Sequence, residues 1–237
     1  MRVTFLAHDG FLIELNTVCL LFDWWKEPIP PLPDKPLLVL ISHRHEDHFN
    51  PEVFTLAERK ADIQFLLGSD FHLLSRNLEK WRLTPEVAAK CRRCGKHDVF
   101  QPLPAVTVET FPSTDEGVAW MVTAEDKTIF HAGDLNWWHW AEEGDAWNRN
   151  MEANFKRYTE PLRGRRADLA MLPLDPRLES GGDLGPDYFL GLMDVRRFFP
   201  MHQWDHFEFT DEFLKRYPQF APITVKIHHN LETFQLD

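Results

Sequence analysis

The chain has 237 residues, a length that fits one large domain or two small ones and allows a substantial core. Its 37 acidic residues outnumber the 26 lysines and arginines, and the formal charge of −11 argues against a nonspecific nucleic-acid-binding protein. Three cysteines are too few, and odd in number, for a disulfide framework, so we expect a reducing, cytoplasmic setting. The sequence shows neither a secretory signal pattern nor an apolar run of about 18 residues, so we expect no membrane span.

The chain opens with three short runs rich in β-branched and aromatic residues, over 2–6, 11–15 and 18–24. Asp9-Gly10 and Asn16-Thr17 separate these runs and favour turns, so we expect a β-meander. His8 lies beside the first turn. A single histidine in such a place is more often structural than a ligand, and we interpret it as structural, with a ligand role as the alternative.

The most informative stretch begins with the apolar run Leu37–Ile41, which shows no alternation and is therefore typical of a strand buried on both faces. His43 and His45 follow two residues apart, so their rings can converge from one side of an extended segment. Asp47 and His48 come next. Imidazole and carboxylate groups bind first-row metals, and a strand end holds them rigidly. The spacing predicts two ligand pairs for two adjacent metals.

A solvated loop is the alternative for this stretch, with Asp47 or Asn50 capping the next helix, but a loop explains none of the histidines. Downstream we expect a helix over 51–60, a strand over 63–67 and a helix over 71–81. Cys91 and Cys94 have the spacing of half a zinc ribbon. Because no second pair completes four ligands, we interpret them as a turn with free thiols.

The second half of the chain predicts further strands over 105–111, 118–123, 128–131, 169–172, 198–202 and 224–227, and helices over 150–162, 188–197 and 211–216. The segment 136–147 is rich in tryptophan, which favours core or lid packing over the alternative of a substrate-binding wall. The glycine-rich loop Ser180–Gly185 is a candidate for the active-site rim.

Three motifs resemble those of the metallo-β-lactamase superfamily of metal-dependent hydrolases. The segment His43-Arg-His-Glu-Asp-His48 resembles its signature, His131-Ala-Gly-Asp134 resembles its fourth motif, and the strand ending at His202 resembles its fifth. The resemblance implies an α+β fold, a four-layer αββα sandwich of two mixed sheets with helices outside, as one domain over 1–237. It implies the metal ligands His43, His45, Asp47, His48, Asp134 and His202.

In this resemblance Asp134 bridges both metals, since a carboxylate has two oxygens. Asp47 is also our candidate catalytic residue, because its free oxygen can orient the attacking water. The order of the motifs most resembles the branch that contains ascorbate-6-phosphate lactonase and related uncharacterised hydrolases.

The third motif departs from the family pattern. The superfamily normally supplies a histidine there, whereas this chain reads Phe111-Pro-Ser-Thr-Asp-Glu-Gly117. We expect Asp115 to replace that histidine, in preference to Glu116, because a short side chain is more easily held in a turn. A carboxylate there shifts the preference from zinc toward manganese or iron. The alternative is a single metal, held by Asp47, His48, Asp134 and His202.

These observations predict a hydrolase that uses one or two divalent ions, zinc, manganese or iron, to activate water against an ester, lactone or phosphodiester of a small molecule. Arg177 is the candidate for binding an anionic substrate. The alternatives are a family member that binds metal without turnover, owing to the altered third motif, and a redox protein that uses iron. We expect no nucleic-acid partner and no membrane, and the sequence leaves a homo-oligomer open.

Overall fold

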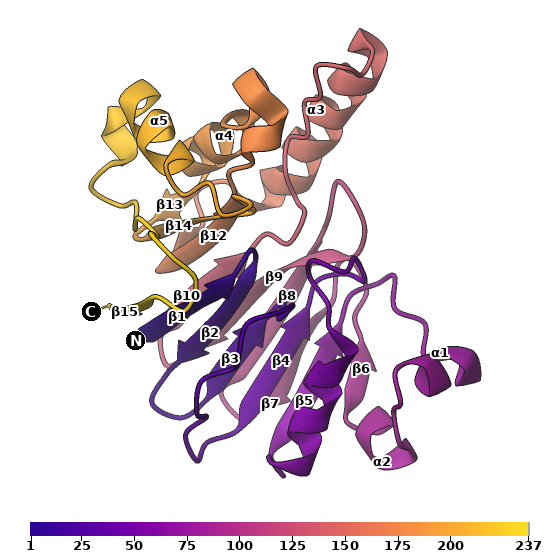
Figure 1. Cartoon of the computed structure of the whole chain (residues 1–237). Coiled ribbons are helices and arrows are strands. Elements are labelled where there is room, and N and C mark those ends of the chain that lie inside the picture. The colour runs from indigo at the N-terminus through magenta and orange to yellow at the C-terminus, as the bar shows by residue number, and fades with distance from the viewer. Residues whose placement is uncertain (237) are drawn as a thin grey trace.

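The computed structural model describes residues 1–236 and contains two large β-sheets packed face to face, with helices on both outer sides (Figure 1). The first sheet has seven strands, in the spatial order β15 (Thr233–Gln235), β1 (Arg2–Ala7), β2 (Gly10–Glu14), β3 (Cys19–Phe22), β4 (Leu37–Ile41), β5 (Ile63–Leu67) and β6 (Cys91–Arg93). The second sheet has six, in the order β14 (Phe198–Met201), β12 (Leu169–Pro173), β10 (Lys127–His131), β9 (Val118–Ala124), β8 (Val106–Pro112) and β7 (Val99–Leu103). A separate two-stranded ladder joins β11 (Arg166–Ala167) and β13 (Asp194–Val195). The predicted α+β, four-layer αββα sandwich is confirmed.

Both sheets are mixed. Strands β15 to β3 pair antiparallel and β3 to β6 parallel, while in the second sheet β7 to β10 pair antiparallel and β10, β12 and β14 parallel. Because the carboxyl ends of parallel neighbours point the same way, the loops after these strands gather at one edge of their sheet.

Strand β4 is buried on both faces, as its unbroken apolar run predicts. Leu38 and Leu40 pack in the core between the two sheets, whereas Leu37, Val39 and Ile41 pack on the opposite face. The helices on that outer face are η1 (Pro51–Glu58), α1 (Ser75–Lys80) and α2 (Pro85–Ala88). Alternate residues of β4 therefore pack on opposite faces of the first sheet, one set against the second sheet and the other against the outer helices.

The outer face of the second sheet is covered by α3 (Asp145–Thr159), α4 (Leu184–Leu192) and α5 (Phe209–Arg216), together with the short helices η2 (Glu160–Leu162), η3 (Pro176–Gly181) and η4 (Pro218–Phe220) (Figure 1). Phe155, Phe189 and Phe213 attach these helices to the apolar cluster that contains the strands of the second sheet, with Phe189 against Phe130 and Phe213 against Phe198. Within residues 1–236, no helix combines the length and the apolar composition needed to cross a bilayer.

Several predicted element boundaries are wrong. The helix expected over 51–60 is a 3-10 helix that ends at Glu58, and the one expected over 188–197 ends at Leu192, because the chain turns there into β13. The expected turn at Cys91 is the edge strand β6, although all three cysteines are free as predicted. The expected strand over 224–227 makes only one bridge, between Thr224 and Phe198, and the late strand is β15. For β6, β13 and β15, pairing with strands distant in the sequence decided the outcome.

Candidate metal centre

Loops that follow strands of both sheets converge on one cluster of histidines and carboxylates. His43 and His45 follow β4, Asp134 follows β10 and His202 follows β14. Asp9 lies in the tight turn between β1 and β2. These strands belong to both sheets, so the cluster depends on how the two sheets pack.

One group of potential ligands contains His43, His45, Asp115 and Asp134, whose ligand atoms all lie within 4.8 Å of one another. His43 Nε2 is 2.9 Å from His45 Nδ1 and 3.5 Å from Asp134 Oδ2. His45 Nδ1 is 3.4 Å from Asp115 Oδ2. Thr114, in contrast, donates its hydroxyl to the backbone carbonyl of Asn136. The structure thus places the carboxylate of Asp115 beside His45, in the same group as His43 and Asp134.

A second group contains His8, Asp9, His48 and His202, again within 4.8 Å of one another. Asp9 Oδ2 is 3.0 Å from His48 Nε2 and 3.8 Å from His202 Nε2. The other oxygen of Asp134, Oδ1, is 3.2 Å from His48 Nε2 and 3.5 Å from His202 Nε2. The two oxygens of Asp134 therefore face the two groups, which is the arrangement that a bridging carboxylate requires.

Several buried atoms at the meeting point of these groups have no hydrogen-bond partner. They are His8 Nε2, both carboxylate oxygens of Asp9, His48 Nε2 and Asp134 Oδ1. Buried polar atoms without partners are costly, and native proteins satisfy nearly all of them. A divalent cation accepts electron pairs from imidazole nitrogen and carboxylate oxygen atoms of this kind, so the residues present fit a metal centre.

A second layer of hydrogen bonds orients the histidine rings. His48 Nδ1 donates to Asp23 over 2.9 Å, and His202 Nδ1 donates to Asp175 over 2.9 Å. His43 Nδ1 lies 2.9 Å from the hydroxyl oxygen of Ser42, which itself donates to Asp23. Each of these rings is thereby held with Nε2 facing the cluster, as is typical of metal-ligating histidines.

The electrostatics follow from burial and from the crowding of carboxylates. Burial by itself lowers the pKa of His48, but the charges of Asp134 and Asp9 outweigh it and raise that pKa well above its usual value. Burial lowers the pKa of His43 to about 3, and the charge of His48 acts in the same direction. Burial raises the pKa of Asp115, and the charge of Asp134 raises it further. The crowded carboxylates make the cluster attractive to a cation.

Asp47 lies at the edge of the cluster. Its side chain is 22% exposed, and its carboxylate is 3.3 Å from His8 Nε2. Burial alone would raise the pKa of Asp47, but the close approach of the His8 ring and the charge of His48 lower it. Asp47 therefore lines the access to the centre, while Asp9 occupies the buried position.

Sequence reasoning missed Asp9 and assigned His8 a structural role, whereas the structure places both in the second group. The available signal was two potential ligands side by side at a strand end, followed by Gly10. A Cβ atom at Gly10 would lie 3.0 Å from the carbonyl oxygen of Ala7, so the tight turn suits glycine.

A cavity of about 260 Å³ opens onto the cluster, and Asp47 and Asp115 line it together with Trp138, Trp140 and Trp147. The rings of Trp138 and Trp140 stack with their centroids 6.4 Å apart. Trp138 is buried, as the expectation of core packing requires, and it lines the cavity together with Trp140 and Trp147.

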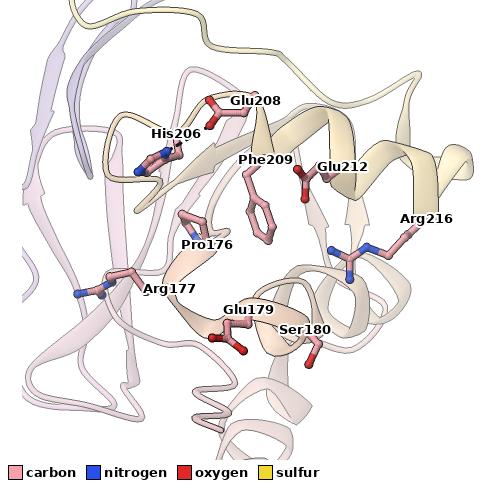
Figure 2. Close-up of a pocket in the computed structure, with 9 residues that line it drawn as sticks. All are labelled: Pro176, Arg177, Glu179, Ser180, His206, Glu208, Phe209, Glu212 and Arg216. Carbon is pink, nitrogen blue, oxygen red and sulfur yellow. Dashed lines mark hydrogen bonds and ion pairs between the residues drawn. The ribbon is translucent and has the colours of Figure 1, made fainter.

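Arg177 lies between this cavity and a larger hollow of about 630 Å³. Figure 2 shows Phe209 projecting into the larger hollow, with Glu179 and Ser180 on one side and Arg216 at the end of α5. Ser180, from the loop expected at the active-site rim, thus lines the larger hollow. Arg177 donates from Nε and Nη2 to Asp175 over 2.6 to 3.1 Å. The same carboxylate accepts the hydrogen bond from His202 Nδ1, so Asp175 links Arg177 to His202.

Comparison with known proteins adds a family and a fold. Residues 2–146 match the family described as the beta-lactamase superfamily domain. A UPF0173 metal-dependent hydrolase of Desulforamulus reducens is 29% identical over 150 residues, which are 56% of this chain and 62% of that protein, so the chain spans less than two thirds of this relative.

Two solved structures show the same fold. Igni18, a metallo hydrolase from Ignicoccus hospitalis, has a TM-score of 0.65 at 17% identity, over 100% of this chain and 99% of that one. CmlA, a diiron β-hydroxylase from Streptomyces venezuelae, has a TM-score of 0.64 at 10% identity, over 99% of this chain and 54% of that one.

Proposed function

Because this chain belongs to the beta-lactamase superfamily, which its residues 2–146 match, we propose that it is a metal-dependent hydrolase with two adjacent divalent ions. One observation carries the proposal. The two oxygens of Asp134 face two separate ligand groups, and five buried atoms at that junction have no hydrogen-bond partner. His43, His45 and Asp115 would hold one ion, His48 and His202 the other, and Asp134 would be shared.

A bound divalent cation lowers the pKa of a coordinated water toward about 7 and polarises the oxygen under attack. The protein supplies orientation. Asp47 lines the cavity, and its lowered pKa keeps it ionised at neutral pH, so it is suited to accept a hydrogen bond and orient water. Asp23 and Asp175 keep the rings of His48 and His202 in place.

The substrate that suits this cavity is a small ester, lactone or phosphodiester with an apolar part and a negative charge. A volume of about 260 Å³ suits a small molecule and not a polymer. Trp138 and Trp140 provide an apolar wall. Within residues 1–236, Nη1 of Arg177 has no hydrogen-bond partner, so it can donate a hydrogen bond to an anionic oxygen of the substrate.

The test is elemental analysis of protein purified without added metal, followed by assays with p-nitrophenyl esters, lactones and bis(p-nitrophenyl) phosphate. We expect nearly two equivalents of metal, and hydrolysis of at least one class that chelation abolishes and metal restores. His45→Ala should lose metal and activity, whereas His97→Ala, an exposed histidine outside the cluster, should keep both.

Two results would count against the proposal. Protein that retains no metal after reconstitution with zinc, manganese or iron would refute the metal centre. Protein that retains metal but hydrolyses none of the three classes would favour the alternative of a metal-binding family member without turnover.

A further inference from the structure

Asp9 is a buried acidic residue that belongs to none of the recognised motifs. Its side chain is fully buried, with 0% exposure, and neither carboxylate oxygen has a hydrogen-bond partner. One of its oxygens lies 3.0 Å from His48 Nε2, 3.6 Å from His8 Nε2 and 3.8 Å from His202 Nε2. Such a group needs a specific reason to stay buried.

The backbone around Asp9 is held in an uncommon conformation. His8 has a left-handed φ of 56°, and the pairing of β1 with β2 shifts register between Phe5 and Ala7. His131 Nε2 donates to the carbonyl oxygen of Asp9 over 2.9 Å. Strained backbone of this kind tends to cluster at functional sites, where the surrounding structure enforces it.

The ion that His43, His45 and Asp115 would hold occupies the first position, and the ion that His48 and His202 would hold occupies the second. We propose that Asp9 is a direct ligand of the metal at the second position, in addition to the residues of the recognised motifs. The ring orientations support this ligand. The Nδ1 atoms of His48 and His202 donate to Asp23 and Asp175, so the Nε2 atom of each ring faces Asp9 and, in the neutral ring that a metal ligand requires, would carry a lone pair. A cation between them would accept lone pairs from both Nε2 atoms and from the Asp9 carboxylate, whose oxygens have no hydrogen-bond partner among the described residues.

This ligand changes the character of the second position. With Asp9 and Asp134 the position has carboxylates from two residues beside its histidines, and oxygen ligands favour manganese and iron relative to zinc. Asp9, Asp47, Asp115 and Asp134 together carry four negative charges, which balance two divalent cations. The inference rests on the metal centre of the proposed function and does not depend on turnover.

The experiment compares wild type with Asp9→Asn, which keeps the size of the side chain and removes its charge. Chelated protein is titrated with Mn²⁺ and, separately, with Zn²⁺ against a fluorescent chelator, and retained metal is counted by elemental analysis. We expect Asp9→Asn to bind Mn²⁺ at one of two positions at least about 10- to 100-fold more weakly, with a smaller loss for Zn²⁺. Asp205→Asn is the matched control, because Asp205 is 59% exposed and pairs with Lys26 outside both ligand groups.

Thermal unfolding of the chelated proteins distinguishes two roles for Asp9, that of a metal ligand and that of a structural charge partner of His48. A variant that unfolds at a lower temperature but keeps two equivalents with Mn²⁺ affinity within twofold of wild type would overturn the inference. If Asp9→Asn does not fold, the smaller Asp9→Ser is measured by the same titration. Because no assay here uses a substrate, loss of one equivalent supports the inference even if wild type hydrolyses nothing.

Discussion

Asp115→Ala is expected to weaken metal binding at the first position and leave the second position unchanged. The Asp115 carboxylate is 3.4 Å from His45 Nδ1, and its side chain is 42% exposed. At about 4 Å, a pair of unit charges interacts by about 1 kcal/mol in water and about 4 kcal/mol at a protein surface. For this partly exposed site we take about 2 kcal/mol, which corresponds to roughly 30-fold weaker binding, since about 1.4 kcal/mol is tenfold.

The assay is competitive titration of Mn²⁺ against a fluorescent chelator, with elemental analysis after gel filtration. Wild type should retain nearly two equivalents and the variant nearly one. Glu116→Ala is the matched control, because Glu116 is the adjacent acid, is 45% exposed and pairs with Arg44 at 3.6 Å. Two equivalents with unchanged affinity in Asp115→Ala would refute the assignment, and a loss in Glu116→Ala alone would transfer the ligand role to that residue.

Three further predictions concern the rest of the molecule. Burial raises the pKa of Cys91 and of Cys94 to about 12, so both remain neutral thiols at pH 8, and iodoacetamide should label the folded protein roughly a thousandfold more slowly than a free cysteine, with a rate that rises as the pH approaches 12. Rapid labelling at pH 8 would contradict this. Leu40→Ala should lower the free energy of unfolding by about 2–5 kcal/mol in urea denaturation, because Leu40 is fully buried between the sheets, whereas Leu74→Ala, at a residue that is 52% exposed, should change it by less than about 0.5 kcal/mol. Similar values for the two variants would be inconsistent with the described core. Asp175→Asn should weaken metal binding at one position by about 10- to 100-fold, because the charged carboxylate that accepts the hydrogen bond from His202 and orients its ring is lost. Unchanged metal affinity in the same titration would exclude that orienting role.

Local pattern was enough to predict the central strand, and the resemblance of the motifs to the metallo-β-lactamase superfamily implied the fold class. The run Leu37–Ile41 was predicted with its observed bounds, because a strand buried on both faces needs apolar residues at every position. The candidate ligands His43, His45 and His48 lie within six residues, so their spacing was visible without tertiary structure. Asp115 could be proposed because no histidine occurs between His97 and His131, which left a carboxylate as the candidate ligand.

Tertiary structure alone decided the place of Asp9 and His8. The turn that holds them is far in sequence from His48 and His202, and it reaches both because β1 and β4 lie in one sheet and β14 in the other. A residue's own neighbours do not encode such a contact, since it depends on the packing of two sheets whose strands come from both ends of the chain. For the same reason the sequence could not show that three tryptophans line the cavity, because burial in a core and exposure to a cavity require the same apolar side chains.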